Sequence, residues 1–125
     1  MSAQEVVARY YEAWQTKHGD LGDVPLAEDF RFTGPVASFD SAEGYRAMAR
    51  EAGRAVTSFE VRRQFVDGQT VCSIIDWEMA IPGVGPMTSA ELLEVQDGQI
   101  VRGELIYDAE ELRRAMAATA GAPKE

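Results

Sequence analysis

The stretch SFEVRRQFVDGQTVCSIIDWEMAIPGVGPMTSAELLEVQDGQIVRGELIY, residues 58–107, decides the fold. Apolar and polar side chains alternate over 58–66, which predicts a half-buried strand. Asp67-Gly68 and Asp97-Gly98 are typical of tight hairpin turns, and a turn rich in proline and glycine covers 82–86. The stretch therefore predicts an antiparallel meander of strands over 58–66, 70–80, 87–95 and 99–107.

The pattern in the rest of the chain is mainly helical. Apolar residues recur at three- and four-residue spacing after Ser2, and Ser2 and Glu5 match a capping box. The further elements expected are helices over 2–17, 21–27, 41–54 and 109–118 and a short strand over 30–33. Strands and helices occupy separate parts of the chain, so we expect one α+β domain over 1–120, with a polar tail over 121–125.

A ligand site follows from this arrangement. A long meander that buries one face against a few helices must curl around them, and the hollow that results is where a small molecule would sit.

Charge and composition limit the classes of partner and chemistry. The formal net charge is -9, whereas binding to nucleic acid or to an anionic membrane needs clustered Lys and Arg. Cys72 and His18 are the only cysteine and histidine, so we expect no disulfide, no metal site and no cofactor. No signal-peptide core or membrane-length apolar run occurs, and we expect a cytoplasmic protein.

The segment CSIIDWEM, residues 72–79, carries large apolar groups on both faces of its strand. A strand that is apolar on both sides is usually covered on both sides. One face would meet the helices and the other a second copy of the chain. We therefore expect a homodimer through the sheet.

Three segments carry a resemblance to a known family: VVARYYEAW at 6–14, AEDFRFTGP at 27–35 and DGQIVRGELIYDAEEL at 97–112. They resemble SnoaL-like members of the NTF2-like superfamily, over nearly the whole chain. The resemblance implies a cone, in which a curved antiparallel sheet wraps around N-terminal helices and a C-terminal helix follows. The group includes ketosteroid isomerases, polyketide cyclases and limonene-epoxide hydrolases, so the fold does not specify one reaction.

The functional residues of the ketosteroid isomerases carry over in part. Their tyrosine that donates to the enolate oxygen matches Tyr10, and their protonated acid falls at Glu91. Their general base, an aspartate before a proline, falls at Gly34, so the resemblance supplies the donors without the base.

The functional residues of the limonene-epoxide hydrolases carry over less completely. That family uses an Arg-x-Asp on a central strand and an Asp on the last strand. Asp76 matches the first aspartate, but Ile74 stands at the arginine. Leu105 or its neighbour Glu104 stands at the second aspartate, so this catalytic set is incomplete too.

Asp76 lies in the middle of an apolar strand, where a carboxylate is costly unless it is paired or protonated. Either it is a buried acid or base with a pKa raised by desolvation, or this side of the strand faces solvent or a dimer edge. Arg63 shares strand parity with Phe59 and Val61, which would turn it inward. In that case it would pair with Asp76 on the adjacent strand. A bulge at Arg62-Arg63 would turn Arg63 outward instead.

Glu91 shares the parity of Leu93 and Val95. If it is buried, it should be protonated at neutral pH and able to donate a hydrogen bond; otherwise it is a surface glutamate near the start of a strand. Glu104 fits either parity of its strand.

Two functions remain open at this point. The first is an acid–base enzyme that isomerises, cyclises or opens the epoxide of a mostly apolar, oxygenated small molecule. In it, Asp76 would move the proton or activate water, and Tyr10 and Glu91 would stabilise an oxyanion. The second is a non-catalytic ligand-binding or dimerisation module. The residues expected at the site are Asp76, Glu91 and Tyr10 as the catalytic set, with Trp14, Phe32, Arg63, Glu104 and Tyr107 around the pocket.

Overall fold

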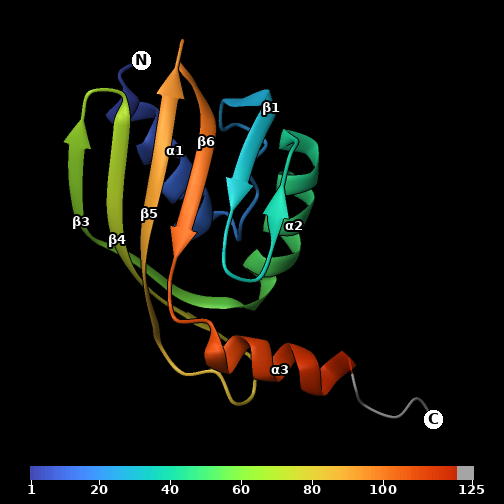
Figure 1. Cartoon of the computed structure of the whole chain (residues 1–125). Coiled ribbons are helices and arrows are strands. Elements are labelled where there is room, and N and C mark those ends of the chain that lie inside the picture. The colour runs from blue at the N-terminus through green and yellow to red at the C-terminus, as the bar shows by residue number, and fades with distance from the viewer. Residues whose placement is uncertain (121–125) are drawn as a thin grey trace.

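A computed structural model describes residues 1–120, and the expected tail over 121–125 lies outside the described residues. The meander is present as four antiparallel strands, β3 (Val56–Asp67), β4 (Thr70–Met79), β5 (Met87–Gln96) and β6 (Gln99–Ile106). Asp97, with φ 51, and the two hairpin glycines adopt the left-handed backbone that such turns require. The prediction from residues 58–107 is therefore confirmed, and the fold is α+β (Figure 1).

Two strands from the N-terminal half extend the sheet. β1 (Leu26–Thr33) runs parallel to β6, and β2 (Ser38–Phe39) pairs antiparallel to β1 at the edge. The strand order is β2-β1-β6-β5-β4-β3. The expected sheet was wholly antiparallel, whereas the parallel pairing of β1 with β6 makes the observed curved sheet a mixed one. The prediction of a helix over 21–27 is wrong, because no helix forms there and β1 begins at Leu26. Pro25 disfavours helical backbone at the residue before it, and a turn at Leu21 leads directly into β1.

Two helices cover one face of this sheet (Figure 1). α1 (Ala3–Thr16) begins with the expected capping box, in which Ser2 and Glu5 exchange hydrogen bonds. α2 (Ala42–Ala55) begins at Ser41, whose hydroxyl accepts a hydrogen bond from the backbone of Gly44. α3 (Glu110–Ala120) follows the last strand at one end of the sheet.

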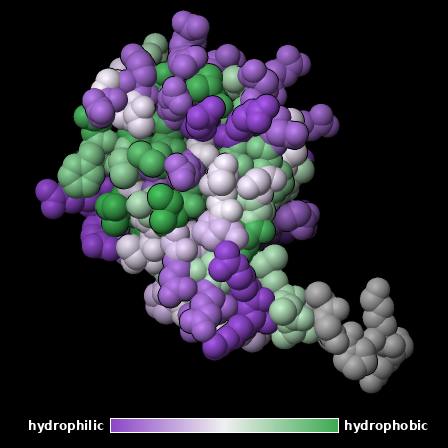
Figure 2. All heavy atoms as spheres, in the orientation of Figure 1, coloured by the Kyte–Doolittle hydropathy of each residue, from purple (hydrophilic) through white to green (hydrophobic). Residues whose placement is uncertain are grey.

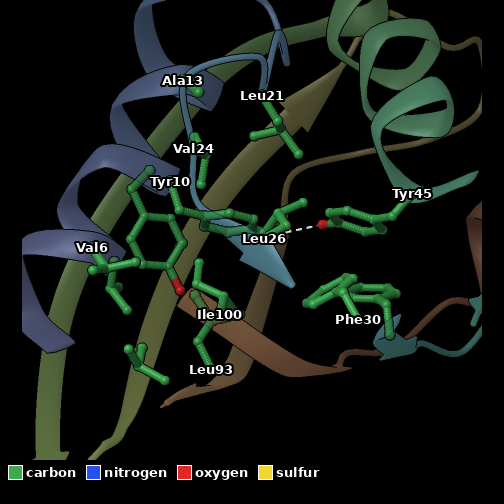
Figure 3. Close-up of a cluster of buried hydrophobic side chains, with 14 of the residues drawn as sticks. Val6, Tyr10, Ala13, Leu21, Val24, Leu26, Phe30, Tyr45, Leu93 and Ile100 are labelled. Carbon is green, nitrogen blue, oxygen red and sulfur yellow. Dashed lines mark hydrogen bonds between the residues drawn. The ribbon is translucent and has the colours of Figure 1, made fainter. Parts of the chain in front are cut away.

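The buried core fills the space between the helices and the inner face of the sheet. Figure 3 shows Tyr10 and Val6 from α1 and Tyr45 from α2 directed toward the strand residues of this cluster. Helix α2 approaches the turn after α1 so closely that a Cβ at Gly53 would lie 1.9 Å from the carbonyl oxygen of His18. Only glycine permits that contact, which fixes α2 against the end of α1.

The outer face of the sheet carries no helix in the part of the chain that the structure describes (Figure 1). Figure 2 shows this face, on which apolar side chains gather over the strands among charged ones. Phe65 and Ile106 on it are 52% and 53% exposed. Among residues 1–120, no helix is both long enough and apolar enough to cross a bilayer.

Candidate functional site

A cavity of about 150 Å³ opens between the inner face of the sheet and the two helices. An apolar cavity of this size is large enough for at least one aromatic ring. Eight of its lining residues are aromatic: Tyr10, Trp14, Phe32, Phe39, Tyr45, Phe59, Trp77 and Tyr107. The remaining lining residues are Gly34, Pro35, Val36, Ala37, Met48, Ala52, Val56, Ile75, Met79, Ser89, Glu91, Leu105 and Leu112. The cavity is therefore an apolar, aromatic site with very few polar groups.

Among residues 1–120, Glu91 is the only carboxylate that lines this cavity, and no Lys, Arg or His of these residues lines it. It lies in the middle of β5, on the side that also buries Leu93 and Val95. Its neighbours across the sheet are Ser73 on β4 and Leu105 on β6, and only 3% of Glu91 is exposed. Of the two alternatives left open for Glu91, the structure shows the buried one.

Two tyrosine hydroxyls of α1 bond to the Glu91 carboxyl group, and a third, from α2, bonds to one of them. Tyr10 Oη donates to Glu91 Oε2 at 3.0 Å, and Tyr11 Oη donates to Glu91 Oε1 at 2.9 Å. Tyr45 reaches the same point from α2, with its hydroxyl 2.5 Å from that of Tyr10. Each carboxyl oxygen thus has a hydrogen-bond partner, which a buried carboxylate needs.

Burial sets the protonation of this cluster. Desolvation raises the pKa of Glu91 from 4.5 to about 7, although the hydrogen bonds from Tyr11 and Tyr10 lower it. Desolvation likewise raises the pKa of Tyr10 and Tyr45 well above their ordinary value, so both remain neutral donors. Glu91 can therefore give or take a proton near neutral pH, which is what general acid–base chemistry requires.

Aromatic pairs form the remaining walls of the cavity. Trp14 of α1 stacks on Phe59 of β3, with ring centroids 6.0 Å apart. Trp77 of β4 meets the edge of Tyr107 at 5.3 Å, and its indole nitrogen donates to Ser89 at 2.6 Å. These contacts hold the aromatic rings in place around the cavity that Glu91 also lines.

Helix α3 lies at the mouth of the cavity. Leu112 lines it, and Arg113 Nη2 donates to the carbonyl oxygen of Pro35 at 2.7 Å. Glu111 accepts a hydrogen bond from the backbone nitrogen of Gly85, in the turn between β4 and β5. These two exposed contacts hold the start of α3 against the rim of the cavity.

Asp76 lies outside the cavity, on the outer face of the sheet. Its side chain is 41% exposed and accepts two hydrogen bonds of 2.9 Å from Arg62 and one of 2.7 Å from Thr88. Hydrogen bonds from Arg62 and then from Thr88 lower the pKa of Asp76. The expectation of a buried Asp76 with a raised pKa is therefore wrong, since β4 turns Ile75 and Trp77 inward.

Two other expected pocket residues also lie on the outer face. The register of β3 shifts between Val61 and Arg63, and this bulge turns Arg63 outward, 5.2 Å from the centre of the Phe65 ring. Arg63 therefore does not pair with Asp76, because Arg62 takes that place. Glu104 is exposed, and its neighbour Leu105 lines the cavity instead.

The structure brings together five of the expected site residues around the cavity: Tyr10, Trp14, Phe32, Glu91 and Tyr107. Gly34 also lines it, so the position of the isomerase base lies at the cavity but has no side chain. The sequence analysis did not assign Tyr11, Tyr45 or Ser89 to the site, and Tyr11 and Tyr45 both lie at core spacing in their helices. The spacing of the two tyrosines places their rings in the core, but nothing in a single sequence shows where the hydroxyl groups point.

This arrangement is a cone with a ligand-sized cavity on its inner side, and a family comparison agrees with it. The SnoaL-like domain family matches residues 7–103. The chain belongs to this family, and its fold is the NTF2-like fold. No curated protein sequence matches the chain.

Solved structures share the fold. An NTF2-like protein of unknown function from Cytophaga hutchinsonii is 21% identical, with a TM-score of 0.78 over 90% of this chain and 96% of that one. An LEH-like epoxide hydrolase from M. tuberculosis is 19% identical, with a TM-score of 0.70 over 94% of each chain. A hypothetical protein with a ketosteroid isomerase-like fold from Catenulispora acidiphila, in complex with trimethylamine, is 14% identical, with a TM-score of 0.72 over 95% of this chain and 98% of that one. At these identities the likeness concerns the fold alone.

Proposed function

We propose that the cavity binds an apolar, oxygenated small molecule and that Glu91 exchanges a proton with it. The observation that carries this proposal is the single buried carboxyl group, hydrogen-bonded to Tyr10, at one wall of an otherwise apolar cavity. The cavity volume of about 150 Å³ favours a ligand of one or two rings over a larger one. The proposal does not use Asp76, which lies on the other face of the sheet.

The chemistry that these residues support is proton transfer next to a carbonyl group. A ligand oxygen that takes the hydrogen bond of Tyr10 leaves Glu91 Oε2 free. Ionised Glu91 then removes a proton from the carbon beside the carbonyl, and the electron pair of the broken C–H bond moves onto the oxygen. Tyr10, supported by Tyr45, stabilises the enolate that forms. When Glu91 returns the proton to the same carbon, the carbonyl group re-forms and the net result is proton exchange. In a β,γ-unsaturated ketone, return of the proton to the γ-carbon re-forms the carbonyl group, moves the double bond into conjugation and completes an isomerisation.

Binding is testable because Trp14 and Trp77 both line the cavity and report on its occupancy by fluorescence. Cyclohexanone and 2-decalone serve as one-ring and two-ring ketone probes. Ala52 lines the cavity from α2, so Ala52→Phe should fill it and abolish the fluorescence change. Ala47→Phe, at an exposed position of the same helix, is the matched control and should still bind. Equal binding by both variants would place the ligand elsewhere and refute the proposal.

A second candidate is a binding module for a small organic ammonium ion. Glu91 has no cationic partner among the lining residues, and eight aromatic rings surround it, which is the composition of a cation–π site. The Catenulispora acidiphila neighbour in complex with trimethylamine fits this candidate. Tetramethylammonium should then bind more tightly as the pH rises past 7 and lose affinity in Glu91→Gln, whereas neutral tert-butanol should show neither effect.

We also propose that the outer face of the sheet pairs two copies of the chain. Partly covered apolar residues lie at its centre: Cys72, Ile74, Ala90 and Leu92. Charged residues of both signs, including Arg63 and Glu94, surround them, so one copy offers complementary charges to another. The apolar gathering in Figure 2 supports this use of the face.

A further inference from the structure

Tyr11 contacts Glu91 from the side away from the cavity. It is 3% exposed, its ring packs against Tyr10 and Phe59, and it is not among the residues that line the cavity. Its hydroxyl nevertheless donates to Glu91 Oε1 at 2.9 Å, whereas Tyr10 binds the other oxygen, Oε2, and lines the cavity. The two carboxyl oxygens of Glu91 thus face different environments.

Two further polar side chains, Ser73 and Gln64, lie between Tyr11 and the surface of the protein. The side-chain amide of Gln64, an exposed residue of β3, donates from Nε2 to Ser73 Oγ at 3.1 Å. Because an amide N–H can only donate, Ser73 must use its own hydrogen elsewhere. Ser73 is fully buried on β4, in register with Glu91, so its hydrogen is available to the oxygen of Tyr11, where such a donor lowers the pKa of Tyr11. The hydrogen of Tyr11 itself is directed at Glu91.

We propose that Tyr11, oriented by Ser73 and Gln64, is a positioning residue that keeps Glu91 Oε1 an acceptor, so that any proton on Glu91 lies on Oε2 beside the cavity. This inference rests on the proposed function, since it assigns the oxygen through which Glu91 would meet a ligand. Both oxygens of Glu91 accept a hydrogen bond, but Tyr10 can turn its hydrogen to Tyr45, because either hydroxyl of that pair can be the donor. Tyr10 can then accept a hydrogen bond from a protonated Oε2, whereas Tyr11 keeps its hydrogen on Oε1. Tyr11 therefore determines which oxygen of Glu91 carries the proton, without contacting the ligand.

The surroundings of Glu91 make this contact measurable. The titratable groups that face it are Tyr10 and Tyr11 from α1 and Tyr45 from α2. The adjacent strands contribute Ser73 and Leu105, neither of which carries a charge. A hydrogen bond to the ionised carboxylate favours that form, so the loss of the Tyr11 hydroxyl should raise the pKa of Glu91.

The test is a titration of the ligand-free protein, followed by NMR of the ¹³C-labelled Glu91 side-chain carboxyl carbon. Tyr11→Phe should move the midpoint of Glu91 upward by about one pH unit from the wild-type value. Ser73→Ala should move it in the same direction by less. Tyr107→Phe is the matched control, because it removes a cavity hydroxyl that makes no hydrogen bond to Glu91 in the described structure, and should leave the midpoint in place.

A midpoint that is unchanged in folded Tyr11→Phe would overturn the inference. If Tyr11→Phe does not fold, Ser73→Ala decides instead, and an unchanged midpoint there has the same meaning. Because the titration needs no ligand, its result is independent of ketone binding. A shifted midpoint with no ketone binding would sink the proposed function alone.

Discussion

The hydroxyl of Tyr10 on α1 donates a 3.0 Å hydrogen bond to Glu91 on β5, across 81 residues of sequence. This contact joins the first helix to the centre of the sheet and places a proton-exchanging group at the wall of an apolar cavity. Four predictions follow from it and from the outer face of the same sheet.

The stability of the protein should fall as the pH rises from about 4.5 to 7. Burial raises the pKa of Glu91 from 4.5 to about 7, so between these values the folded state binds a proton that the unfolded state has released. Stability from this group is fully present below 4.5 and is lost as the pH passes 7. Urea unfolding of wild type should lose about 3 kcal/mol more than Glu91→Gln over this range. Parallel pH profiles for the two proteins would contradict the buried titration.

Removal of the Tyr10 hydroxyl should destabilise the fold. Tyr10→Phe leaves the Tyr45 hydroxyl and Glu91 Oε2 without this partner in a buried site, at a cost of about 1–3 kcal/mol. Urea unfolding below the midpoint of Glu91 and above it measures the effect, which should be larger where the carboxylate is ionised. Tyr107→Phe, at a half-buried tyrosine, is the control; an equal loss in both variants would argue against the Tyr10–Glu91 contact.

Asp76→Asn should leave ligand binding and proton exchange unchanged. Asp76 is paired with Arg62 on the outer face, and an exposed ion pair contributes little to stability. Ketone binding, followed by the fluorescence of Trp14 and Trp77, should match the wild type at each pH. A large loss of binding in Asp76→Asn would mean that the outer face communicates with the cavity.

Leu92→Glu should convert a dimer to monomers if the outer face pairs two copies. Leu92 lies on that face in β5, and a buried, unpaired carboxylate at an apolar interface is costly. Sedimentation velocity over a range of concentrations measures the change. Gln15→Glu, at an exposed position of α1, adds the same charge elsewhere and should leave assembly unaffected. A wild type that stays monomeric at every concentration would refute the pairing.

The sequence predicted the sheet better than it predicted the site. Alternation and the Asp-Gly turns are local signals, and they located the four strands of the meander. They put Glu91 on the same side of its strand as Leu93 and Val95, but left open whether that position is buried. The parallel pairing of β1 with β6 depends on contacts far apart in the chain, which local patterns do not carry. Asp76 was misplaced because its apolar neighbours suit an outer face that is partly covered as well as they suit a core.

The site depends on the directions of the tyrosine hydroxyl groups and of the Glu91 carboxyl group. Helical spacing is consistent with Tyr10 and Tyr45 in the core, where the structure places them. That the Tyr10 hydroxyl bonds to both Glu91 and Tyr45 follows from the angle between α1, α2 and the sheet, which no spacing rule supplies. The bulge at Arg62 is of the same kind, because one extra residue reverses the side of Arg63.

The most direct test of the central claim is proton exchange between the protein and a ketone probe in D₂O. Proton NMR follows the loss of signal from the hydrogens on the carbons beside the carbonyl group of 2-decalone. The experiment compares wild type, Glu91→Gln and Asp76→Asn. Glutamine keeps a donor at this position and should still permit binding, but it cannot take a proton. We expect wild type and Asp76→Asn to accelerate exchange and Glu91→Gln to bind the ketone without doing so. Equal exchange by wild type and Glu91→Gln, with binding intact in both, would contradict the assignment of Glu91 as the proton-transfer group.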